Sequence, residues 1–127
     1  MNIIVLCTAI LILLYLGLSY NVSRVRRKRR GDPSVTDAQL AKAVRAHGNA
    51  SEYIPLFVVL LLYFNATAAG IVATAIAITI TVSRVLHCTG MFLVEDATRA
   101  HPLRFLGALG TYVCLLAAGL VVLGQAF

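Results

Sequence analysis

Charged residues are scarce in this chain of 127 residues, making up 13% of it against about 25% in a typical soluble domain. Tryptophan is absent, and the three cysteines, Cys7, Cys88 and Cys114, show no CxxC or metal-ligand spacing. Phosphate loops, HEXXH motifs and nucleophiles with an evident base are also missing. These absences exclude an ordinary soluble domain and a cysteine-ligated metal centre. The cysteines are expected to pack as small apolar residues between helices.

Long uncharged stretches fill most of the chain instead, and about 20 apolar residues suffice for a helix to cross a bilayer. The sequence therefore predicts an all-α membrane protein, an antiparallel bundle of four transmembrane helices. We expect one domain, residues 1–127, with spans at about 3–23, 37–64, 68–93 and 103–126. Basic residues follow the first span rather than precede it, which favours a retained helix over a cleaved signal peptide.

All eleven lysine and arginine residues fall at one end of this expected bundle, six of them between Arg24 and Arg30. The positive-inside rule then places both polar loops in the cytoplasm and both termini outside. A polar connector is expected from Arg24 to Val35, with Ser34 or Thr36 capping the next helix. Such a basic run beside a span is typical of contact with anionic lipid, so nucleic acid is not an expected partner.

The second span carries polar residues that lipid cannot accommodate. Arg45, Asn49 and Glu52 recur at i, i+4 and i+7 and so share one helix face. Each ion would cost several kcal/mol against lipid, so this face must meet protein, another subunit or water. Two interpretations stay open: a structural network joining helices, or a polar pocket. Pro55 favours a kink that widens the space beside this face.

On the third span Arg84, His87 and Met91 likewise share a face, at i, i+3 and i+7. Together with the Arg45 face they indicate a cationic cavity open to the loop end. Three further arginines are expected near its mouth: Arg24, Arg99 and Arg104. Clustered arginines suit a ligand with carboxylates and lower the pKa of a thiol.

Residues 45–55 read Arg-Ala-His-Gly-Asn-Ala-Ser-Glu-Tyr-Ile-Pro. This segment resembles the second-helix signature of the MAPEG family, the membrane-associated proteins in eicosanoid and glutathione metabolism, whose pattern is close to Arg-Ala-x-x-Asn-x-x-Glu-x-x-Pro. Arg24, the Asp32-Pro33 pair, Arg84 with His87, and the arginine-rich start of the fourth span extend the resemblance. The chain is most similar to the compact bacterial members, which implies a bacterial inner membrane.

The resemblance implies a homotrimer with glutathione, as cosubstrate, bound between subunits near the cytoplasmic face. The residues implied to bind it are Arg24, Arg45, Asn49, Glu52, Tyr53, Arg84 and His87. In that arrangement Glu52 meets the amino group and arginines meet the carboxylates. Arg99 or Arg104 would be catalytic, favouring the thiolate that attacks a lipophilic small-molecule electrophile arriving from membrane lipid.

Two departures from the family pattern narrow the range of reactions that we expect. Met91 stands where several eukaryotic members have a glutathione-contacting tyrosine, and Phe105 where prostaglandin-forming members have serine. A transferase or peroxidase acting on other electrophiles is therefore expected rather than prostaglandin or leukotriene synthesis. The alternatives are a non-catalytic member that binds a thiol or lipid, and, less favoured, a small proton-coupled transporter. A carrier of that kind has a carboxylate in its first span, and this chain has none there.

Overall fold

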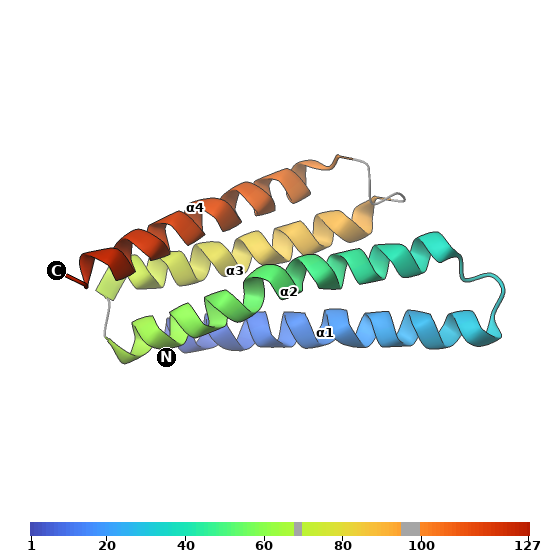
Figure 1. Cartoon of the computed structure of the whole chain (residues 1–127), viewed down its shortest axis with the longest axis horizontal. Coiled ribbons are helices and arrows are strands. Elements are labelled where there is room, and N and C mark those ends of the chain that lie inside the picture. The colour runs from blue at the N-terminus through green and yellow to red at the C-terminus, as the bar shows by residue number, and fades with distance from the viewer. Residues whose placement is uncertain (68–69, 95–99) are drawn as a thin grey trace.

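The computed structural model describes residues 1–67, 70–94 and 100–127, which form four helices (Figure 1). These are α1 (Ile3–Gly31), α2 (Asp37–Ala66), α3 (Gly70–Leu93) and α4 (Pro102–Gly124). All four are long and apolar enough to cross a membrane, which confirms the predicted four-helix membrane fold. Both termini and the α2–α3 connection lie at one end, and the two polar connections lie at the other. The sidedness of these ends in the membrane stays a prediction.

The helices begin at the polar residues that the sequence provides for capping. Thr36 and Gln39 form a reciprocal capping box at the start of α2, and Pro102 occupies the first turn of α4 after the cap His101. Ser34 has a different role, because its hydroxyl and backbone N–H both donate to Asp32. These two bonds hold the pKa of the exposed Asp32 carboxyl below its usual range.

Helix α1 continues beyond the apolar stretch, so the connector expected from Arg24 onwards is helical as far as Gly31. Arginine and lysine are good helix formers, and basic side chains in the last turn interact favourably with the helix dipole. The helix stops immediately before Asp32 and Pro33, because a residue that precedes proline avoids the α conformation. Arg29 then pairs with Asp37 across the short loop.

Helix α3 is the centre of the bundle, since it packs against each of the other three helices, and α1 and α2 also pack together. Phe57 and Phe64 of α2, Leu11 of α1 and Ile80 of α3 are fully buried in the shared core. Cys7, Cys88 and Cys114 are buried and free, in keeping with their expected role as small packing residues. The core therefore holds α1, α2 and α3 together, while α4 docks on α3.

Glycines bring α3 and α4 unusually close. A Cβ built on Gly107 would lie 2.5 Å from the carbonyl oxygen of Ser83 and 2.6 Å from the backbone nitrogen of His87. On α3, a Cβ at Gly90 would lie 2.7 Å from the backbone nitrogen of Arg104. Close approach at small residues is the usual basis of helix packing in membranes. The contact fixes the start of α4, and with it Arg104, against α3.

Helices α2 and α4 meet through long side chains that reach across α3. The hydroxyl groups of Tyr53 and Tyr112 lie 3.5 Å apart, and nearer the termini the Tyr63 hydroxyl donates to Gln125 at 2.7 Å. Towards the polar loops, residues of α2, α3 and α4 instead line a common space. An opening between α2 and α4, floored by α3, is left at that end of the bundle.

Candidate functional site

This opening holds a pocket of about 640 Å³, here called the α2–α4 pocket. Its chemically distinctive lining residues are Arg45, Asn49, Glu52, His87, Met91 and Arg104. Ligand pockets typically measure about 300–1,000 Å³, so a small peptide-sized molecule fits. Three helices contribute, and residues predicted separately from the second, third and fourth spans are brought to one place.

The two charged residues of α2 that line the pocket are exposed in the single chain. Arg45 and Glu52 lie seven residues apart, about 10 Å along the helix, so they cannot pair with each other. Within the described residues neither side chain makes a hydrogen bond or an ion pair. The hydrogen-bond network at this face therefore includes Asn49, through Arg84, but not Arg45 or Glu52.

The alignment of α1 with α2 bears on the depth expected for Glu52. Asn2, next to the start of α1, donates to Asn65 at the end of α2 at 2.6 Å, which aligns the two helices. Counting about 20 residues of α2 from that level, the length of a hydrocarbon core, reaches Arg45. On that count Arg45 is expected near the membrane interface and Glu52 about two turns further in. An uncovered carboxylate at that depth is costly, so a subunit, a ligand or water must face it.

Arg84 lies beneath the pocket rather than among the residues that line it, and it is 1% exposed. Its guanidinium donates to Asn49 Oδ1 at 2.6 Å and to Thr111 Oγ1 at 3.4 Å. It also lies over the Tyr53 ring, 5.3 Å from the centroid, while its Nε has no hydrogen-bond partner among the described residues. Because Asn49 accepts through Oδ1, its NH₂ group is directed elsewhere and remains a donor.

Tyr53 is half-buried, and its hydroxyl is directed towards Tyr112 on α4, with the two rings edge to face. It is not among the residues that line the α2–α4 pocket. Tyr53 and Arg84, which contact each other, thus lie outside the set of residues that line the pocket. The sequence offered no sign of Thr111 or Tyr112, because an α4 partner for the α2 face becomes evident only once the helices are packed.

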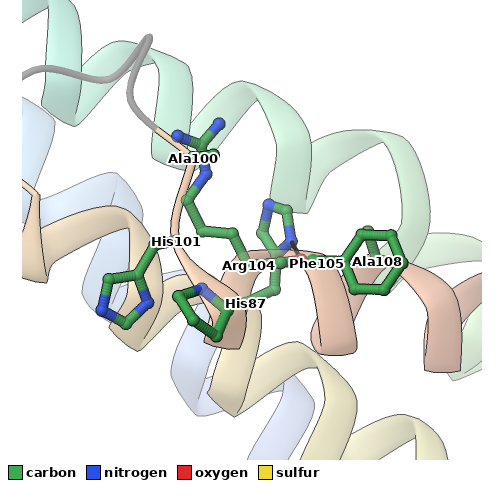
Figure 2. Close-up of a pocket in the computed structure, with 7 residues that line it drawn as sticks. His87, Ala100, His101, Arg104, Phe105 and Ala108 are labelled. Carbon is green, nitrogen blue, oxygen red and sulfur yellow. Dashed lines mark hydrogen bonds between the residues drawn. The ribbon is translucent and has the colours of Figure 1, made fainter.

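His87 and Arg104 form a wall between the α2–α4 pocket and a second pocket of about 570 Å³ on the α4 side. The backbone carbonyl of Arg104 lies 3.1 Å from His87 Nδ1, a contact in which Nδ1–H donates to the carbonyl oxygen. Figure 2 shows the Arg104 side chain between the imidazoles of His87 and His101, with Phe105 further along α4. His101, which sequence reasoning missed, lines this second pocket.

Two predicted site residues are not found in the α2–α4 pocket: one lies elsewhere, and the other is not described by the structure. Arg24 lies at the end of α1, donates to Asn21 at 3.3 Å, and lines a separate pocket between α1 and α2. Within one protomer it does not join the α2–α4 pocket. Arg99 lies outside the described residues.

The fold and the pocket together define a class of protein: a four-helix membrane protein with a polar, ligand-sized pocket at the end that carries its polar loops. The MAPEG family model matches residues 4–124, and the chain belongs to the MAPEG family.

Curated relatives match only part of the chain. It is 40% identical over 60 residues to the inner membrane protein YecN of Escherichia coli K12, and equally to YecN of Escherichia coli O6:H1. The match covers 45% of this chain and 44% of each relative, so it spans less than half of their length. No solved structure matches the chain.

Proposed function

We propose that the protein binds glutathione in the α2–α4 pocket and transfers its thiolate to a lipophilic electrophile, as a transferase or peroxidase. One observation carries the proposal: Arg45, Asn49, Glu52 and Arg104 line a single pocket. Glutathione is a tripeptide with two carboxylates, an ammonium group and a thiol. Arginines suit the carboxylates, Glu52 the ammonium group, and Asn49 a backbone carbonyl of the ligand.

A homotrimer would supply what the single chain lacks. Glu52 is exposed on the protomer at a depth where lipid contact is costly, and a neighbouring subunit would cover it. The same neighbour would bring its own Arg24 to a pocket that Arg24 does not reach within one protomer. We infer a bacterial inner membrane location, with the polar loops and the pocket mouth facing the cytoplasm, from the basic loops and the YecN relatives.

Loss of either charged residue of α2 is expected to weaken glutathione binding strongly. Calorimetry on the detergent-purified protein would compare the parent with Arg45→Ala and Glu52→Ala. Each lost charge-assisted bond is worth about 1.5–3 kcal/mol, so affinity is expected to fall roughly tenfold or more. Arg26→Ala is the matched control, because Arg26 is basic, exposed and away from the pocket. Absence of binding by the parent at millimolar glutathione would contradict the proposal.

Arg104 is expected to act on the thiol. Arg104→Ala should lower turnover of a generic aryl halide or lipid hydroperoxide roughly tenfold or more at saturating glutathione, because a guanidinium beside the sulfur favours thiolate. Arg99→Ala would be assayed in the same way, because the family resemblance implies that either Arg99 or Arg104 favours the thiolate. Unchanged turnover in both variants would contradict an arginine-activated thiol.

The same assays separate the alternatives. Binding without turnover of any electrophile would identify a non-catalytic thiol-binding member. A proton-coupled carrier of cationic drugs is disfavoured by the pocket itself, where Arg45 and Arg104 line the same space as Glu52.

A further inference from the structure

The pocket lined by Arg24 lies on the other side of α2, between the last turns of α1 and the start of α2. It encloses about 390 Å³. We call it the α1–α2 pocket. Its basic lining residues are Arg24, Lys28 and Lys42. Gln39 and Ser34 add neutral polar groups, and Phe92 contributes an apolar wall. Arg24 is shared with the proposed glutathione site of a homotrimer, whereas Lys28 and Lys42 do not line the α2–α4 pocket and so report on the α1–α2 pocket separately.

The cations of this pocket are held in place by the fold. Arg24 and Lys28 are four residues apart and share a side of α1. Lys42, half-buried on α2, donates to the carbonyl oxygens of Phe92 and Val94 at the end of α3. Its ammonium is thereby fixed at the inner wall, with a formal positive charge and one remaining N–H donor.

The charge balance of the pocket is positive. Asp32 is the one carboxylate among its lining residues, and both of its bonds to Ser34 use the same oxygen, Oδ1. The pocket therefore contains three cations and one anion, and one oxygen of that anion already accepts two hydrogen bonds. Such a site suits a monoanion or dianion with several acceptor oxygens, as in a phosphate ester.

The depth of the pocket points to a lipid. Arg24 comes two residues after Val22, the last residue of the apolar part of α1, which is the level of phospholipid headgroups. Leu13, Leu16 and Tyr20 are exposed and precede Arg24 at spacings of three or four residues. They form an apolar stripe on α1 that leads up to the cations, and acyl chains can lie along such a stripe.

We propose that the α1–α2 pocket binds the phosphodiester headgroup of an anionic phospholipid, with Lys28 and Lys42 as its principal cations. Basic pockets between transmembrane helices are known to hold anionic headgroups. The rest of the basic run, including Arg27, would add only diffuse attraction to an anionic membrane surface.

Native mass spectrometry of the full-length protein in detergent tests this, with phosphatidylglycerol and phosphatidylcholine of identical acyl chains as probes. Phosphatidylglycerol is expected to bind more tightly than phosphatidylcholine. Lys28→Gln should weaken phosphatidylglycerol binding about fivefold. The matched control is Arg27→Gln, which removes the same charge one residue away but does not line the pocket, and it should leave the affinity unchanged.

Three outcomes would overturn the proposal. Equal weakening by Lys28→Gln and Arg27→Gln would show attraction to net charge alone. Equal affinity for the two lipids would show no headgroup recognition. Displacement of phosphatidylglycerol by soluble glycerol phosphate at comparable concentration would assign the pocket to a free phosphate ester instead. Both substituted side chains are exposed, so folding is not at risk in either variant.

Discussion

Replacing Arg84 with alanine is expected to destabilise the protein by about 3 kcal/mol. Arg84 is the largest fully buried side chain of the described residues, and it joins α3 to Asn49 of α2 and Thr111 of α4. Alanine would leave a cavity at the meeting point of three helices and would remove the donor from the buried Thr111 and the half-buried Asn49. Denaturation of the purified protein in mixed micelles would measure the loss.

Arg84→Met separates packing from ligand binding at the same position. Methionine fills much of the arginine volume, so it should avoid most of the cavity cost while still losing the two donors, and stability should fall by only about 1–2 kcal/mol. Glutathione affinity should nevertheless fall roughly tenfold, because Asn49 would lose the bond that orients its amide. A methionine variant that binds glutathione as tightly as the parent would contradict a positioning role for Arg84.

Gly107→Ala is expected to cost about 3 kcal/mol of stability, although it adds a single carbon atom. That atom would lie 2.5 Å from the Ser83 carbonyl oxygen and 2.6 Å from the His87 nitrogen. Both contacts are to backbone, so relief requires α4 to move away from α3. Turnover should fall as well, because the same contact places Arg104 beside His87.

The matched control for this variant is Gly119→Ala, on the same helix. A Cβ at Gly119 meets nothing within 4 Å, so the change should be neutral or stabilising by up to about 1 kcal/mol. The two variants would be compared by denaturation in the same detergent. Equal stability would show that α3 and α4 do not rely on close approach at Gly107.

Much of this architecture is predictable because a membrane restricts both the length of the helices and the placement of charged side chains. Uncharged stretches of about 20 residues define the spans, and charges inside a span must avoid lipid, so the shared face of Arg45, Asn49 and Glu52 had to be sheltered. The structure adds that Asn49 alone of these three is used to join helices, through Arg84.

Other features depend on packing that periodicity does not encode. Spacing places Arg84 and His87 on one face of α3, yet Arg84 points beneath the α2–α4 pocket while His87 lines it. Thr111 has no sequence signal, since a threonine in an apolar span is ordinary until it meets a buried guanidinium. The helical end of α1 was missed because loss of hydrophobicity marks the membrane boundary, not the end of hydrogen bonding along the helix.

The opening between α2 and α4 has a consequence for enzymology. A lipophilic reactant that enters it from the side is drawn from the hydrocarbon phase, where its abundance depends on partition rather than on the volume of buffer. For the proposed reaction, adding micelles or vesicles at fixed enzyme and fixed total electrophile would dilute the electrophile and slow the rate, while glutathione, dissolved in water, would be unaffected. The apparent Michaelis constant of the electrophile should therefore be expressed as its mole fraction in the amphiphile. That of glutathione should be expressed as a molar concentration in water.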